Sequence, residues 1–143
     1  MTVVEPVLDR AAAERARLVN KHRAELLQSG RAVTLGLLAR GQDKSHEAAR
    51  QWVRRQRHAG RLVYVVHNGG TYIPTFQFDE AFGLDPAASE VVAVLVARGF
   101  SDWAVWTWFE SRSPWLGKRT PADALRAGDL SGLRRALDGL FQE

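Results

Sequence analysis

Residues that could carry catalysis or hold a metal are scattered along this sequence. The four histidines, His22, His46, His58 and His67, form no pair at metal-ligand spacing, and the chain has no cysteine. The stretch LGKRT contains the Gly-Lys pair of a phosphate-binding loop. Such a loop also needs a glycine where Arg112 stands and a serine or threonine where Arg119 stands. We therefore expect neither an enzyme nor a bound cofactor or metal.

Arginines gather instead on one segment of the first half. Arg50, Arg54 and Arg57 follow i, i+4, i+7 spacing, which places them on one face of a helix expected over residues 46–59. A guanidinium group can bind either guanine edges or phosphate oxygens. A solvated basic helix, or one that binds an acidic partner, is the alternative. The candidate base-contacting residues are His46, Arg50 and Gln51, and the candidate backbone-contacting residues are Arg54, Arg55 and Arg57.

The neighbouring segments predict the elements that would position this helix. A short helix is expected over Ala32–Arg40, and the basic helix then starts after Ser45 as N-cap. LVYVV and TYI, separated by HNGG, predict a β-hairpin with an Asn-Gly turn. This order is that of a winged helix-turn-helix. The hairpin tip, His67 and Asn68, is either a wing that reaches the minor groove or only a turn. An earlier helix from Asp9 to Gln28 is expected to pack on a neighbour or on its copy in another subunit.

Charge divides the chain into two unlike halves. Residues 1–67 hold 13 Lys or Arg against 6 Asp or Glu, a net +7, whereas residues 68–143 hold 7 against 10, a net −3. A basic half suggests binding to a polyanion. We expect a DNA-binding region over 1–78 and a helical domain over 79–143, joined by a hinge within TFQFDEAFGLDP. No apolar run is long enough to span a membrane and no signal peptide is evident, so a cytoplasmic protein is expected.

The second half predicts four helices with clear start signals and an unusual density of tryptophan. Four of the five tryptophans lie between residues 103 and 115. At least two of them must be core in so small a module, and Trp108 and Trp115 are expected near an interface, where aromatic anchors are common. The helix starts are Asp85-Pro86, Ser101, the capping-box-like Thr120 and a last helix from about Leu130.

The stretch WFESRSPWLGKRTPADALRAGDLSGLRRALDGL resembles the C-terminal toxin-binding domain of the Xre/MbcA/ParS antitoxins. The match comprises a Trp-rich helix, a turn with Leu-Gly, a Thr-Pro helix start and a closing aliphatic repeat. Ser113-Pro114 replaces the usual Pro-Asn of the turn, and Lys118 replaces a second glycine. The matching residues are Trp108, Leu116, Gly117, Thr120, Pro121, Leu125, Gly128, Leu133, Leu137 and Leu140.

This resemblance implies an antitoxin that neutralises a RES-domain, NAD-degrading toxin by blocking its active site, and that represses its own operon. It implies a cognate toxin and operator DNA as partners, within a homodimer or a toxin–antitoxin hetero-oligomer. A stand-alone dimeric regulator, or a degenerate helix-turn-helix that only positions subunits, remains open. The expected fold is mainly α, with an N-terminal helix, a winged helix-turn-helix and a C-terminal helical bundle. The toxin-binding residues implied are Trp108, Trp115, Leu116, Phe141, Gln142 and Glu143.

Overall fold

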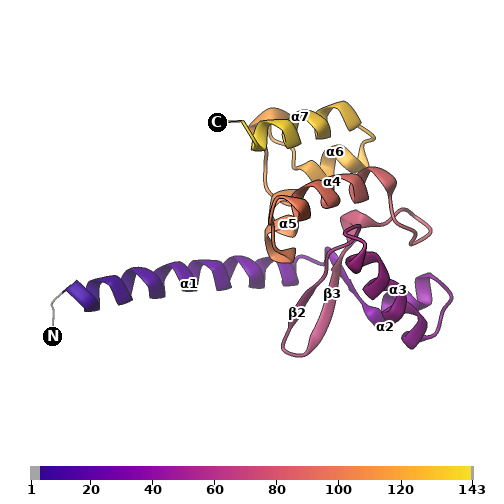
Figure 1. Ribbon diagram of the computed structural model, residues 1–143, viewed down its shortest axis with the longest axis horizontal. Helices are drawn as coiled ribbons and strands as arrows, with labels where there is room; N and C mark the ends of the chain where they lie inside the picture. The colour runs from indigo at the N-terminus through magenta and orange to yellow at the C-terminus, as the bar shows by residue number, and fades with distance from the viewer. Residues whose placement is uncertain (1–3, 143) are drawn as a thin grey trace. The chain divides into compact units, whose positions relative to one another are not determined.

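The computed structural model describes residues 4–142, with side chains from residue 9 onward. This part of the chain is mainly helical, with seven α-helices and one small antiparallel sheet (Figure 1). It divides into two compact units, Met1–Arg31 and Ala32–Glu143. The second unit therefore contains both the basic helix and the tryptophan-rich helices. The functional division expected at residue 78 stays a prediction.

The first unit consists of helix α1, Val4–Gln28, and the short segment after it. The helix starts earlier than expected, so Asp9, the residue from which it was expected to run, lies inside it. Pro6 does not prevent the earlier start, because a proline in the first turn has no intrahelical N–H bond to lose. The end is as predicted, with Gly30 at a φ of 76°.

The second unit opens with an element that the sequence analysis missed. Ala32–Thr34 forms strand β1, and only Leu35–Gly41 forms helix α2, so the helix predicted over residues 32–40 starts three residues late. The β-branched pair Val33 and Thr34 suits a strand, and the Thr34 hydroxyl accepts a hydrogen bond from the Leu37 N–H as N-cap. The strand needs a distant partner to form, which local periodicity does not reveal.

Helix α3, His46–His58, agrees closely with expectation, and the predicted hairpin forms, although its first strand begins at Val65 rather than at Leu62. Ser45 caps α3 by accepting from the Ala48 N–H at 3.1 Å. Strands β2, Val65–His67, and β3, Gly70–Pro74, pair in antiparallel fashion, and β1 adds on the other side to give the order β1-β3-β2. Asn68 and Gly69 both have positive φ, 49° and 78°, as a type I′ hairpin turn requires.

A hydrophobic cluster joins these elements. Leu38 of α2, Val53 of α3, Ile73 of β3 and Leu62 before the hairpin are all buried in it. The loop before α4 closes one end of this cluster, because the Phe82 ring lies so near Gly41 that a Cβ there would clash with it. The Gln42 amide donates to the Phe82 carbonyl at 2.9 Å. These contacts tie the loop before α4 to the C-terminal end of α2.

The connection after the sheet is packed rather than open. The 3₁₀ turn Thr75–Gln77 buries Phe76 and Gln77. The Gln77 side chain accepts from the Val63 N–H at 2.7 Å and donates to the Val63 carbonyl at 2.9 Å and the Pro74 carbonyl at 3.0 Å. The start of the expected hinge is thus tied to the sheet by a buried amide with three hydrogen bonds.

The rest of the chain is a set of four helices and one 3₁₀ turn, with the predicted start signals confirmed. Asp85, Ser101 and Thr120 all act as N-caps, and Thr120 forms a full capping box with Asp123. Figure 1 shows α4 and α5 between the sheet-bearing part of the second unit and the pair α6–α7. The elements are α4 Pro86–Ala97, α5 Asp102–Phe109, η2 Pro114–Leu116, α6 Pro121–Arg126 and α7 Leu130–Leu140.

Aromatic stacking joins the sheet-bearing part to the helices. The rings of Phe76 and Phe109 stack with centroids 3.8 Å apart, and Phe109 is fully buried. Trp106 is also fully buried, with Trp103 stacked on it at 5.8 Å. Trp108 packs against a smaller cluster of buried residues between η2, α6 and α7. At least two of the four tryptophans between residues 103 and 115 were expected in the core, but only Trp106 among these four is buried. Trp103 and Trp108 are half-buried and Trp115 is exposed, so the expected number was too high.

Candidate functional site

The basic face of α3 is a strongly charged, exposed surface of the second unit. Ala49 and Val53 are buried, so the opposite side of α3 is turned outward. Because α3 has a well-formed cap and two buried anchors, the side of the helix that carries its charged residues faces solvent. All six residues that the sequence nominated for DNA contacts lie on this helix, at least partly accessible to solvent: His46, Arg50, Gln51, Arg54, Arg55 and Arg57.

The N-terminal turn of α3 carries one acidic residue, Glu47, among the basic side chains. Glu47 accepts from Arg50 at 3.0 Å and from the Gln51 amide at 3.4 Å. The hydrogen bond from Arg50, with the neighbouring positive charge, holds the pKa of the Glu47 carboxyl below its ordinary value. A ligand that takes the Arg50 guanidinium must therefore replace an exposed ion pair, which is a weak competitor in water.

Arg57 has a different role from the other arginines of α3. Its guanidinium forms two hydrogen bonds with the Asp102 carboxylate, at 3.2 and 2.6 Å, and lies 5.0 Å from the centre of the Tyr64 ring. The bond to Asp102 raises the pKa of Arg57. Arg57 was nominated for phosphate contact, but the structure places its guanidinium on the first residue of α5. It thus joins α3 to the tryptophan-rich helix.

The hairpin adds residues that the sequence analysis did not nominate. A hollow of about 240 Å³ lies between α3 and the strands. Arg50 and Arg54 line it on one side, and Val66 and Thr71 line it on the other. Val66 is 59% exposed, which is unusual for a valine in a strand. The pairing of Val66 with Thr71 across the hairpin would have identified both, had the register been known.

The hairpin tip is exposed, as its proposed role as a wing requires. His67 and Asn68 are both exposed, and their side-chain nitrogens lie 3.2 Å apart. The tip therefore presents two exposed polar side chains in the same unit as the basic helix.

The aromatic surface at the chain end is divided between core and exterior. Trp115 is 47% exposed, and its indole lies against Gly139 of α7 so closely that a Cβ there would clash with the ring. Leu116 is only 6% exposed, so its side chain supports this surface from beneath rather than forming it. Trp108 is half-buried and lines, together with Trp115 and Leu140, a hollow of about 320 Å³.

The tail nominated as a blocking element is partly held by the helices. The Phe141 ring lies 4.3 Å from the Arg98 guanidinium and meets the Phe100 ring edge-on at 6.3 Å. Gln142 is exposed, and Glu143 lies outside the described residues. Phe141 is therefore engaged within the chain, and only Gln142 among the described tail residues is fully available to a partner.

Other kinds of site find no support in the described part of the chain. No three of its His, Asp or Glu side chains come together as a metal site. None of its helices combines the length and the apolar character that crossing a bilayer would demand.

Comparison with known proteins gives the fold and little else. No protein-family model matches this sequence, and no curated protein matches it significantly. The structure is similar to one described as the NMR structure of Rv2175c, with a TM-score of 0.60 and 24% sequence identity. The match covers 77% of this chain and 81% of that one. The chain therefore shares its mainly helical fold with that protein.

Proposed function

We propose that this protein binds double-stranded DNA through α3, as the second helix of a winged helix-turn-helix. Helix α2 and the turn at residues 42–45 lead into α3, and the β2–β3 hairpin serves as the wing. The observation that carries the proposal is the exposure of five basic or amide side chains on α3, opposite its buried anchors: His46, Arg50, Gln51, Arg54 and Arg55.

The roles of these residues follow from their position along the helix. His46, Arg50 and Gln51 lie on the first turns, which enter the major groove in helix-turn-helix proteins. Arg54 and Arg55 lie further along and suit phosphates. Arg57 is assigned a positioning role here because its guanidinium is paired with Asp102. His67 and Asn68 at the hairpin tip suit the adjacent minor groove.

Salt-dependent binding tests this proposal. Fluorescence anisotropy with a labelled mixed-sequence duplex would give log K against log salt for the wild type, for Arg54→Gln/Arg55→Gln and for Arg134→Gln/Arg135→Gln. The last pair is a control, because both arginines are exposed on α7. Removal of one phosphate-binding arginine should make the slope shallower by roughly 0.9. The proposal fails if the duplex is not bound at low salt, or if the two double variants behave alike.

A second proposal extends from the resemblance to the Xre/MbcA/ParS antitoxins. We propose that the surface around Trp115 binds a RES-domain toxin and blocks its active site. The observation that favours it is an indole 47% exposed yet packed closely against Gly139, since an exposed aromatic held in place is a common anchor of a protein interface. On this view Trp108 lines the same hollow, and Gln142 extends from its edge. The repressor would act on the operon that encodes both proteins.

Co-expression separates this proposal from the first. When the chain is co-expressed with a RES-domain toxin encoded beside it, Trp115→Ala and deletion of residues 141–143 should weaken neutralisation and leave DNA binding intact. Arg54→Gln/Arg55→Gln should do the reverse. If the toxin stays lethal beside the wild-type chain, the antitoxin proposal fails and a dimeric regulator without a toxin partner is left.

A further inference from the structure

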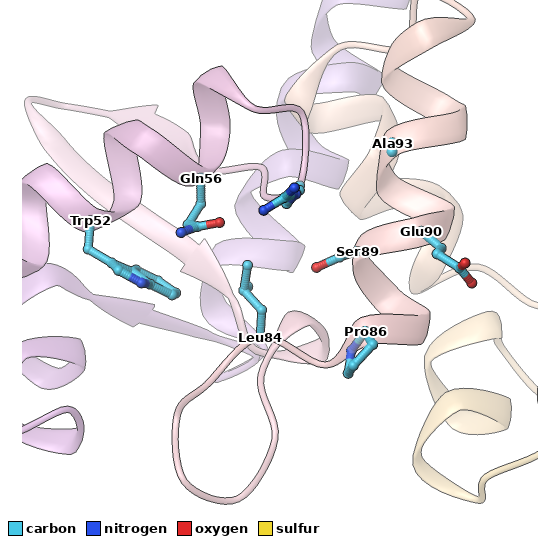
Figure 2. A pocket seen from close by; sticks show the side chains of 8 residues that line it. Trp52, Gln56, Leu84, Pro86, Ser89, Glu90 and Ala93 are labelled. Carbon is cyan, nitrogen blue, oxygen red and sulfur yellow. The ribbon is translucent and has the colours of Figure 1, made fainter.

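We infer that a cavity between α3 and α4 binds a small aromatic carboxylate. The cavity has a volume of about 520 Å³, within the range of small-molecule sites. Trp52 and Gln56 line it from α3, and Ser89 and Ala93 line it from α4 (Figure 2). Both helices belong to the second unit, so the cavity does not depend on the placement of α1.

The walls suit a flat apolar ring. The Trp52 indole is fixed in place, because the Phe78 ring stacks near it at 6.3 Å and the Lys44 ammonium lies 5.3 Å from its centre. Figure 2 shows the indole directed toward Leu84, with Pro86 below the start of α4. An aromatic ring between an indole and aliphatic side chains gains both apolar burial and stacking.

The polar groups of the cavity have unused hydrogen-bonding capacity. The Ser89 Oγ is buried and has no hydrogen-bond partner in the described part of the chain, although most buried hydroxyls have one. Figure 2 shows this oxygen directed into the cavity, on the side of Gln56. No hydrogen bond engages the Gln56 side chain among the described residues. A ligand that carries an acceptor near Ser89 would satisfy a group that the fold leaves unpaired.

The charges lining the cavity favour an anion over a cation. Arg61 lines the cavity, and its side chain forms no ion pair within residues 9–142. The other charged lining residue, Glu90, turns its carboxylate away from the Trp52 side in Figure 2. A carboxylate attached to the ring would therefore meet the Arg61 guanidinium without facing the Glu90 carboxylate. This combination selects an aromatic acid from among flat ligands.

Indole ¹⁵N–¹H spectra of the full chain give a direct test, because each of the five tryptophans contributes one signal. Trp52→Phe assigns the relevant signal. Benzoate, salicylate and indole-3-carboxylate are the probes, and benzamide is the neutral match for benzoate. At least one acid should shift the Trp52 signal saturably with a Kd of about 1 mM or tighter, and benzamide should bind about tenfold more weakly.

Three variants sharpen the test. Arg61→Gln should raise the Kd of the acid about tenfold and leave the Kd of benzamide unchanged. Ser89→Ala should raise the Kd of the acid about threefold. Arg55→Gln, on the exposed face of α3, should leave the Kd of both probes unchanged. Unchanged signals from the other four tryptophans would show that each variant is folded. The inference is overturned if no acid gives a saturable shift, if benzamide binds equally well, or if Arg61→Gln and Arg55→Gln have the same effect.

A consequence for DNA affinity rests on the proposed function. A ligand that touches α3 and α4 together would change how firmly α3 is held, and the anisotropy assay with and without the bound acid would measure the change. Binding of the acid without any DNA binding would retain this inference and reject the proposed function.

Discussion

The basic face of α3 and the aromatic region around Trp115 were both expected from the sequence to meet partners, yet the structure treats them differently. The nominated residues of α3 all reach solvent, whereas those of the chain end range from exposed Trp115 to buried Leu116. The physical reason is that a charged group must stay in water or find a counter-charge, so its exposure follows from its type. An aromatic residue is stable in a core or in an interface, and its type does not choose between them.

The largest loss of stability is expected when a buried aromatic residue, Phe109, is replaced. Phe109→Ala removes a fully buried ring that stacks on Phe76, and should lower the free energy of unfolding by about 3–5 kcal/mol. Arg55→Ala, on the exposed face of α3, should change it by less than about 0.5 kcal/mol. Urea unfolding followed by circular dichroism measures both. Similar losses in the two variants would remove the distinction between the regions.

Trp115 should give an intermediate value, because about half of its surface is already exposed. Trp115→Ala should cost about 1–2 kcal/mol in urea unfolding, less than Phe109→Ala. Gly139→Ala is the matched probe of the contact between them. It should destabilise the wild-type chain, where its Cβ would clash with the indole. In the Trp115→Ala background it should stabilise α7 by up to about 1 kcal/mol, through helix propensity alone. Equal effects in both backgrounds would show that the indole does not lie on Gly139.

Asp123 is a charged residue near the aromatic region, and it should stabilise the fold by capping the N-terminus of α6. Hydrogen bonds from the Thr120 N–H and from Arg126 lower the pKa of Asp123 from 3.8 to about 2. Because the folded-state pKa is the lower one, the stabilisation is complete above pH 3.8 and is lost as the pH falls toward 2. Asp123→Ala should cost about 1 kcal/mol at pH 7, after allowance for solvent screening.

Stability measured at pH 7 and again near pH 2 checks the sign of this effect. The gap in stability between the wild type and Asp123→Ala should close at the lower pH. A gap that persists near pH 2 would contradict the assignment.

A smaller loss of stability than in the three preceding cases is expected for Arg57, the arginine of α3 that is paired with Asp102. Arg57→Gln breaks the pair with Asp102, which is partly screened by solvent, and should cost about 0.5–1 kcal/mol. Arg54→Gln should cost nothing measurable. A double-mutant cycle with Asp102→Asn isolates the pair, and its coupling energy should shrink in about 1 M salt. No coupling at low salt would return Arg57 to the set available for phosphate contact.

Local signals predicted much of this fold, and long-range ones were needed for the rest. The caps at Ser45, Asp85, Ser101 and Thr120 were readable because each lies within four residues of the groups that it binds. Strand β1 was missed because its partner β3 lies some forty residues away. The same limit hid Val66 and Thr71 beside α3, the link from Arg57 to Asp102, and the contact of Trp115 with Gly139.

The buried side-chain amide of Gln77 predicts a residue that related sequences should share. Its one side chain supplies both an acceptor and a donor to the backbone at Val63 and Pro74. Glutamate would lose the donor, and leucine would lose both, at nearly equal volume. Chains that share this architecture should therefore keep a glutamine soon after the last strand, even where other residue types replace the arginines of α3 and the tryptophans.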